Sequence, residues 1–519
     1  MSFHLSKKSI LKKTAQVSML TLLSRILGIF REFLMVRYLG VGAVSDAFIA
    51  AFKLPNFFRH IFAEGALNAS FVPVMVKTVK DGNRAEANGL MTISFLFFEG
   101  LVLLIYLFVL IKTNWVLLVL APGFSAEQVA YTIPFLRILF SFLFFISSSA
   151  LLSGALNAVN HFFVPAFGTP LWNMIYIGSL VLCLSYALPV TYLCVGIIFG
   201  AFVLFALHLV VFFKHNFTFG RIDAGSIAAF KSVMAKFLPC LFGVSIVELN
   251  LFISGSIASF LPKGSISLLY YGSRFMNIPL GMFAVAFSSI MLPHFSRLVL
   301  YAPRRLNFYL LEIAKFVTWI ILPAMLFLMF VSRDLFIFLL GAKATPSHVH
   351  QGCIILILYS SGLLFLCVNK ILLSMFYALK DTWSTTLAAG LCALINVVGD
   401  LLGIWLFGVY GIGAANTIAA LAMTLACLIF LHKRHKLSFY VGQYLHFFVR
   451  YLLQLACGCA LFVGSYRLAQ HLLTSIGYSW FMTTSYGFFM TACMLIAVTM
   501  IFLFITRNLF GLKVYFLKR

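Results

Sequence analysis

Charged and polar side chains interrupt an otherwise apolar segment near the start of the chain. Arg25, Arg31 and Glu32 lie close to Ser24 and Gly28 in this segment. With helical spacing, Ser24, Gly28 and Arg31 share one face of a helix, and the other two residues flank it. Guanidinium groups bind phosphate through paired hydrogen bonds. The residue types therefore predict an anion site, and a phosphate-bearing ligand rather than a simple monovalent ion.

A second polar stripe lies in the next apolar segment. Its members recur with the period of an α-helix: Asp46, Lys53, Asn56, His60, Glu64 and Asn68. Arg59 adjoins the stripe, and the opposite face carries phenylalanines. Pro55 lies inside the segment, so we expect a helix kink and a freed backbone carbonyl there.

A third polar set occurs much later in the chain. Arg274, Asn277 and Gly281 have the spacing i, i+3, i+7 beside Pro279. Because the earlier stripe also contains a proline, we expect Pro55 and Pro279, together with the flexible Gly28, to be bending points.

Arginines are costly inside a membrane. One at the centre of a span costs about 2.5–3.5 kcal/mol, so the four in these segments cost on the order of 10 kcal/mol unless water or counter-charges meet them. Nearby acidic residues are too few to neutralise them. We therefore expect a cationic, partly hydrated cavity between the two halves of the chain. The alternative is that some arginines form buried ion pairs or reach lipid headgroups, as Arg31 with Glu32 or Arg37 would do.

A smaller cluster of oxygen-bearing side chains could hold a cation. Asn396 and Asp400 are one helical turn apart, Thr417 lies in the following segment and Glu248 in an earlier one. Such oxygens bind Na⁺ or accept a proton. A hydrogen-bonded contact between helices is the alternative. The cysteines lie mostly in apolar runs and the histidines form no zinc motif, so no metal or other cofactor is expected.

These polar residues must be positioned by membrane-spanning helices. The chain has 519 residues, of which 63% are hydrophobic and 10% charged, whereas globular proteins carry about 25% charged residues. This composition excludes a soluble enzyme, and runs that are apolar on every face exclude a β-barrel. We predict an all-α polytopic membrane protein with about 14 spans, at 12–39, 42–75, 88–112, 129–157, 160–187, 190–213, 236–261, 264–297, 308–333, 350–379, 384–407, 409–431, 444–472 and 479–506.

Charge predicts the orientation of these spans. Lysines and arginines gather in alternate connections, whereas the opposite connections hold only Lys112, Lys263, Arg333, Lys343 and Arg467. By the positive-inside rule, both termini are cytoplasmic. The net charge of +24 then reflects topology and attraction to anionic lipids, and no nucleic-acid partner is expected. The basic N-terminus precedes no cleavage site, so we expect no removable signal peptide.

Weak internal similarity predicts two related lobes. AFKLPN (51–56) is followed by FVPVMVK, and FMNIPLG (275–281) is followed by IMLPHFSR. GALNAVN (154–160) likewise has a counterpart in MFYALKD (375–381). Each offset is six helices, which predicts lobes at 1–230 and 231–436, related by a pseudo-two-fold axis, and two extra helices at 437–519.

The sequence also resembles a known family. SRILGIFRE (24–32), the stretch 46–74, GALNAVNHFFVPAFGTPLWN (154–173), the stretch 270–296 and GVYGIGAANTIAAL (408–421) are similar to the MviN/MurJ family of lipid II flippases. That family belongs to the superfamily of multidrug, oligosaccharidyl-lipid and polysaccharide exporters. The resemblance implies a transporter, not an enzyme, in the bacterial inner membrane. Its substrate would be lipid II, the undecaprenyl-diphosphate-linked peptidoglycan precursor, and other cell-wall synthesis proteins would be possible partners.

The resemblance also assigns roles to residues. Arg25, Arg31, Arg59 and Arg274 would line the cavity, with Asp46 and Glu64 in support, and the last two helices would receive the lipid tail. Relatives often have acidic residues where this chain has Ser273 and Asn277, which makes the cavity more positive. Some relatives carry a sodium-binding aspartate where this chain has Ser254. Sodium coupling and membrane potential both remain possible driving forces.

Two other functions are alternatives to a lipid II flippase. Another exporter of the same superfamily would share the fold, but a drug exporter needs carboxylates for cationic substrates. A membrane glycan transferase or polymerase needs a catalytic carboxylate or metal site, and the chain has only 13 acidic residues and no convincing acid–base cluster.

Overall fold

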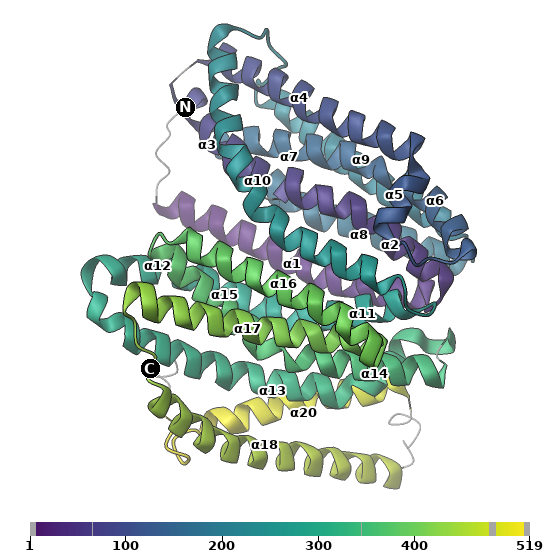
Figure 1. Ribbon diagram of the computed structural model, residues 1–519, viewed down its shortest axis with the longest axis vertical. Coiled ribbons are helices and arrows are strands. Elements are labelled where there is room, and N and C mark those ends of the chain that lie inside the picture. Colours follow the sequence, from purple (N-terminus) through teal and green to yellow (C-terminus); the bar gives the residue numbers. More distant parts are fainter. Residues whose placement is uncertain (1–6, 65, 82, 344, 477–483, 513–519) are drawn as a thin grey trace. The chain divides into compact units, whose positions relative to one another are not determined.

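Helices make up the regular structure of the protein. The computed structural model describes residues 7–64, 66–81, 83–343, 345–476 and 484–512, and no β-strand occurs in these ranges. The chain divides into two compact units, unit 1 (Met1–Ser267) and unit 2 (Leu268–Arg519). Figure 1 shows the course of the helices along the chain. The all-α prediction is confirmed.

The helices of unit 1 follow one another through short connections. They are α1 (Lys7–Leu39), α2 (Ala43–Arg59), the π-helix η1 (His60–Glu64), α3 (Ala66–Lys80), α4 (Arg84–Ile111), α5 (Thr113–Leu120), α6 (Ala126–Phe140), α7 (Phe142–Ala158), α8 (Phe163–Ser185), α9 (Val190–Lys214) and α10 (Ala224–Ala258). Helix α7 is the central element, because residues on all of its faces are buried. It packs against α3, α4 and α9.

The unit boundary passes through α11 (Ser265–Pro279), and the remaining helices belong to unit 2. They are the π-helix η2 (Leu280–Val285), α12 (Ala286–Tyr301), η3 (Pro303–Arg305), α13 (Leu306–Leu340), η4 (Gly341–Lys343), α14 (Pro346–Ser361), α15 (Leu363–Ala378), α16 (Thr382–Phe407), α17 (Val409–His435), α18 (Val441–Ser475) and α20 (Ser485–Thr506). Helix α13 packs against α14, α15, α18 and α20.

The same succession of elements occurs twice. In α2–η1–α3 and in α11–η2–α12, a helix containing an internal proline runs into a π-helical segment and then into a second proline-containing helix. A π-helical turn leaves backbone groups out of the regular ladder and bends the helix. The two π-helices therefore lie next to the positions where Pro55 and Pro279 predict kinks.

Further pairs of elements correspond in order. Helices α6 and α7 are separated at Ser141, as α14 and α15 are at Gly362. The turn that follows each pair contains a residue with positive φ, Asn160 at 60° after α7 and Lys380 at 58° after α15. The partners also match, since α3 packs on α7 as α12 packs on α15, and α8 packs on α9 as α16 packs on α17. This double succession supports the internal repeat that the sequence predicts.

In each unit, a side-chain contact joins the turn after the paired helices (α6–α7 or α14–α15) to the end of a later helix (α9 or α17). In unit 1, His161 Nδ1 lies 3.1 Å from His215 Nε2. In unit 2, His435 Nε2 lies 2.8 Å from Asp381 Oδ2. Burial and the neighbouring His215 and Lys13 lower the pKa of His161. Burial alone would raise the pKa of Asp381, but hydrogen bonds from Ser384 and His435 outweigh it and lower that pKa to about 2.

The compact units do not divide where the predicted repeats do. Helix α10 contains residues assigned from 231 onward to the second lobe, yet it packs on α3 and α4 and belongs to unit 1. Aromatic contacts between Phe97 and Phe230 and between Phe98 and Phe237 make this packing tight. The predicted boundaries describe an internal repeat rather than compact units. They remain a prediction: lobes at 1–230 and 231–436, and extra helices at 437–519.

Eleven helical segments of the described residues are long and apolar enough to cross a membrane. The chain is thus a multi-pass membrane protein, although the predicted number of 14 spans is not confirmed. Helices α1, α2–α3 and α20 are the predicted spans missing from the eleven. The first two carry the charged residues of the predicted site, which lower their hydropathy. Large apolar side chains such as Leu104, Phe108 and Ile111 on α4 are exposed, as lipid solvation requires.

We predict that Gly411→Ala destabilises unit 2. A Cβ at Gly411 would lie 2.1 Å from the backbone of Gly403, where α16 and α17 touch. Overpacking of this kind costs about 1–3 kcal/mol, and backbone atoms cannot rotate away. Thermal unfolding of the purified protein in detergent should show a lower melting temperature.

Gly390→Ala in α16 is the matched control, because no atom lies within 4 Å of the added carbon. Equal melting temperatures for the two variants would contradict the close approach of α16 and α17.

Candidate functional site

The polar stripe of α2 contacts α10 through Lys53. The Lys53 ammonium donates a hydrogen bond to the backbone carbonyl of Phe252 at 3.1 Å. It occupies the space beside Gly255, where a Cβ would lie 1.7 Å from Nζ. Any larger residue at 255 would therefore displace this lysine. Lys53 thus joins two helices of unit 1, besides any role in binding an anion.

Arg31 is held by several side chains in the contact between α1 and α8. Its guanidinium donates to Glu32 Oε1 at 2.6 Å and to Asn173 Oδ1 at 2.9 Å. It also lies over the rings of Trp172 and Tyr176, at 5.3 Å and 5.2 Å from their centroids. The side chains of Arg31 and Glu32 are only 16% and 12% exposed. These contacts match the ion-pair alternative for Arg31.

Ser24 belongs to the same contact between α1 and α8, because it lies on the same face of α1 as Arg31, two turns earlier. The Asn173 amide donates to both the backbone carbonyl and the hydroxyl of Ser24, each at 3.2 Å. Arg25 is half-buried on the adjoining face. No atom lies within 4 Å of the position that a Cβ would take at Gly28, so open space adjoins this part of α1. Ser24 and Arg31 are thereby brought together, as their spacing predicts.

Arg59 lies where α2 passes into η1. Its Nε donates to Asn56 Oδ1 at 2.9 Å, and its guanidinium lies 3.2 Å from His60 Nε2. All three residues are half-buried. The stripe therefore forms a continuous polar surface over the last turn of α2. The side chain of Glu64, which the sequence places further along this stripe, lies outside the described residues.

Asp46 has a different surrounding from the one predicted. It is 1% exposed, and its carboxylate accepts hydrogen bonds from the backbone amides of Gly264 at 2.6 Å and Ser267 at 2.8 Å. The Gln128 side chain donates a third bond at 3.3 Å. These amides lie at the N-terminus of α11. Asp46, which belongs to α2, therefore caps α11. In this position the Asp46 carboxylate stabilises the packing of α2 against the start of α11, in addition to the supporting role in an anion cavity that the sequence predicts.

Arg274 and Asn277 lie on α11 in unit 2. The Arg274 guanidinium lies 4.7 Å from the centroid of the Tyr270 ring. Asn277 is exposed, and its amide donates to the Ser273 carbonyl at 2.8 Å. A guanidinium stacked on an aromatic ring makes its hydrogen bonds in its own plane. The geometry suits an arginine that binds a phosphate while its face rests on an aromatic ring.

The predicted cation ligands lie partly together. Asn396 and Asp400 are both buried on one face of α16, at 4% and 0% exposure. The Thr417 hydroxyl donates to the Leu358 carbonyl at 2.7 Å, which ties it to α14. Glu248 lies on α10 of unit 1, whereas the other three belong to unit 2.

Two polar side chains with specific contacts were not singled out by the sequence analysis. Asn173 bridges Arg31 and Ser24. It is the last residue of GTPLWN, part of a stretch that carries the family resemblance, but the resemblance assigned it no role. Glu99 lies within the predicted span 88–112, and Ser147 donates to its carboxylate at 2.5 Å. An ionisable residue inside a span is the signal that would have identified Glu99.

The site residues thus divide into two kinds. Glu32, Asn173 and Asp46 bind other parts of the fold and position α1, α8 and α11. Arg25, Arg59 and Arg274 lie half-buried on polar faces of α1, α2 and α11. Guanidinium groups of this second kind can bind the oxygens of a phosphate. The described side chains of this arrangement are suited to binding and releasing an anion.

Comparison with known proteins gives a consistent result. The family described as "Lipid II flippase MurJ" matches residues 35–482. A probable lipid II flippase MurJ of Vibrio cholerae is 31% identical over 434 residues, covering 80% of this chain and 81% of the relative. The lipid II flippase MurJ of Burkholderia cenocepacia is 29% identical, over 80% of this chain and 83% of its own length.

Solved structures agree with this match. A structure described as "Lipid II flippase MurJ, inward closed conformation" has a TM-score of 0.77 and 25% identity, and the match covers 95% of this chain and 99% of that one. An inward-facing multidrug resistance MATE transporter has a TM-score of 0.67 at 14% identity, over 79% of this chain and 94% of its own. The second likeness concerns the fold alone.

We predict that Asp46→Asn lowers stability. The amide can accept one backbone bond but presents a donor to the second N–H, which leaves a buried group unpaired at a cost of about 1–3 kcal/mol. Thermal unfolding in detergent should give a lower melting temperature than for the unaltered chain.

Glu127→Gln is the control, because Glu127 pairs with the neighbouring Lys263 at the surface, with both side chains about half exposed. Exposed pairs contribute about 0–1 kcal/mol, so this variant should unfold near the original temperature. An Asp46→Asn variant of unchanged stability that fails in transport would instead make Asp46 a cavity residue.

Proposed function

The chain belongs to the lipid II flippase MurJ family, and we propose that it moves lipid II from the cytoplasmic to the periplasmic leaflet of the bacterial inner membrane. The observation that carries the proposal is the family match over residues 35–482, which includes Arg59 and Arg274, whereas Arg25 and Arg31 precede it on α1. The substrate is an undecaprenyl diphosphate joined to the peptidoglycan precursor. Its diphosphate is the kind of anion that arginines recognise.

The proposed binding site uses the polar faces of α1, α2 and α11. Arg25, Arg59 and Arg274 hold the diphosphate, and Arg31, Lys53 and Asn56 complete the cationic surface. Arg31 is neutralised in part by Glu32, which lies 2.6 Å from its guanidinium. The sugar and peptide headgroup stays in water, and only the headgroup crosses. This avoids the cost of moving polar groups through hydrocarbon.

We propose alternating access as the mechanism. The two repeats rock against each other, and a bound anion offsets the repulsion between cations of the two repeats. The π-helices that adjoin Pro55 and Pro279 support bending at those positions. Gly28 adds flexibility to α1, where open space adjoins it.

The polyprenyl chain remains in lipid, along a groove formed by α18 and α20. These helices pack on each other and on α13. Their contact is apolar and includes Trp319, Tyr451 and Leu503. Leu453 and Ile501 are large exposed side chains on the same helices. Such a surface suits a hydrocarbon chain rather than the polar headgroup.

Both termini are proposed to be cytoplasmic. In unit 1, Lys13 donates to the Asn160 carbonyl at 2.8 Å, and Arg84 donates to the His215 carbonyl. These contacts gather the N-terminal segment and three connections at one end of the unit, all of which the positive-inside rule assigns to the cytoplasm. Lysines and arginines there favour anionic lipids as further partners.

The energy source is proposed to be a sodium gradient or the membrane potential. Asn396, Asp400 and Thr417 supply oxygens for Na⁺, with Glu248 as a further acidic group, and the protein needs no other cofactor. Ser254 in place of a sodium-binding aspartate weakens the sodium alternative. A net movement of cations or anions with each cycle would couple transport to the potential.

We predict that Arg25→Ala or Arg59→Ala abolishes rescue of a bacterium depleted of its own lipid II flippase. Each variant loses a guanidinium that holds the diphosphate, while protein levels in the membrane stay near normal. Purified protein should also bind lipid II less tightly than the unaltered chain does, with binding of undecaprenyl phosphate measured alongside to separate recognition of the headgroup from that of the tail.

Arg467→Ala is the matched control, because Arg467 is an exposed arginine of α18 outside the proposed site. Full rescue by both the Arg25 and Arg59 variants would refute the anion site.

A separate prediction concerns the energy source. Asp400→Asn removes the one carboxylate of the α16 cluster and should reduce the dependence of transport on sodium. Headgroup translocation in vesicles, measured with and without a sodium gradient, tests this. Unchanged sodium dependence would exclude this cation site and leave the flippase function unaffected.

A further inference from the structure

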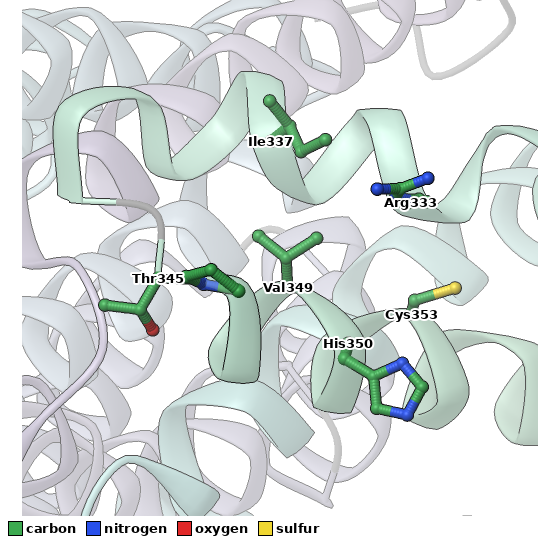
Figure 2. A pocket seen from close by; sticks show the side chains of 7 residues that line it. Arg333, Ile337, Thr345, Val349, His350 and Cys353 are labelled. Carbon is green, nitrogen blue, oxygen red and sulfur yellow. The ribbon is translucent and has the colours of Figure 1, made fainter.

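A cavity in unit 2 is lined by residues that do not belong to the proposed transport site. It has a volume of about 550 Å³ and separates the C-terminal half of α13 from the N-terminal half of α14. Figure 2 shows its lining, which includes Arg333 and Ile337 from α13, Thr345 before α14, and Val349, His350 and Cys353 from α14. Sites for small molecules commonly have volumes of about 300–1,000 Å³.

The polar groups of this cavity favour an anion. Arg333 and His350 are exposed, and in the described part of the chain neither side chain makes a hydrogen bond. Asp334, the adjacent carboxylate, does not line the cavity and interacts electrostatically with both Arg333 and Tyr466 of α18. Thr345 caps α14 by accepting from the His348 amide at 3.3 Å, and the positive end of the helix dipole adds to the cationic character.

The walls of the cavity are apolar. Ile337 and Val349 face each other across it in Figure 2, and Cys353 lies beside them. An inorganic anion bound at Arg333 would leave these side chains uncovered by any ligand. An amphiphile would pair its charged group with the cations and its hydrocarbon with the walls.

The position of these cations is also unusual. The positive-inside rule depletes lysine and arginine from the outer connections, and only five occur there in this chain. Two of the five, Arg333 and Lys343, flank the α13–α14 connection beside the cavity. Of these two, Arg333 lines the cavity itself.

We propose that this cavity binds the phosphate group of an anionic phospholipid of the outer leaflet. Arg333 and His350 donate hydrogen bonds to the phosphate oxygens, and the start of an acyl chain lies between Ile337 and Val349. Such a lipid would bind the outer ends of α13 and α14 independently of the substrate. The proposal goes beyond the flippase function and does not depend on it.

Cys353 provides a local reporter of occupancy. The full-length protein is placed in phosphatidylcholine nanodiscs with or without phosphatidylglycerol, and alkylation of Cys353 by a maleimide is followed by peptide mass spectrometry. Phosphatidylglycerol should slow the alkylation several-fold. Cys457, an exposed cysteine on α18, serves as the internal reference and should react at the same rate in both lipids.

The variants separate this site from general lipid effects. Arg333→Gln and His350→Ala should each abolish the protection, whereas Arg467→Gln, on another exposed arginine, should retain it. Inorganic phosphate added to phosphatidylcholine nanodiscs should not protect Cys353.

Three results would overturn the proposal. The first is equal alkylation in both lipids, and the second is full protection in both the Arg333 and the His350 variants. The third is protection by inorganic phosphate as strong as that by phosphatidylglycerol, which would make the ligand a free anion rather than a lipid. Melting temperatures equal to that of the unaltered chain in detergent show that the variants are folded, so these outcomes can be interpreted.

Discussion

The energetic cost of charge in hydrocarbon governs how this protein is built. Each ionisable side chain in a span must find a partner or water, because an unpaired charge costs several kcal/mol. The structure meets this requirement with specific contacts: Arg31 with Glu32 and Asn173, Lys53 with the Phe252 carbonyl, Asp46 with two backbone amides. These contacts also fix how α1, α2, α8 and α10 pack, so the polar groups specify the arrangement of helices that hydrophobicity alone leaves open.

The same constraint separates structural from ligand-binding cations. A guanidinium with a buried carboxylate partner, as in Arg31, is already satisfied and changes little when a ligand arrives. Arg59 donates a hydrogen bond to Asn56 and lies beside His60, and the Arg274 guanidinium rests on the Tyr270 ring. In the proposed function, the oxygens of a diphosphate accept hydrogen bonds from these guanidinium groups. The proposed selectivity for an anion rests on the scarcity of carboxylates in the chain, which has 13 acidic residues, as much as on the number of arginines.

Local features were predictable from the sequence, and long-range partners were not. Hydropathy predicts the helices, and Pro55 and Pro279 indicate where their regular geometry is interrupted. Helical spacing places Ser24 and Arg31 together. Asp46, by contrast, caps a helix more than two hundred residues away, at Gly264 and Ser267, and no periodicity reveals such a pairing. The packing of α10 on α3 and α4 likewise depends on tertiary contacts of Phe230 and Phe237, which is why repeat matching does not give the boundary of the compact units.

The two repeats show which properties the backbone preserves and which the side chains decide. Positive φ angles recur at Asn160 and Lys380 and at Asn216 and Lys436, so the turns that end corresponding helices are alike. At these same turns, His161 meets His215 in one unit and Asp381 meets His435 in the other. In the first pair, burial and the neighbouring His215 and Lys13 lower the pKa of His161. In the second, hydrogen bonds from Ser384 and His435 outweigh burial and lower the pKa of the Asp381 carboxyl. Turns with the same backbone geometry therefore carry different side-chain chemistry, so the fold alone does not determine the charges placed on it.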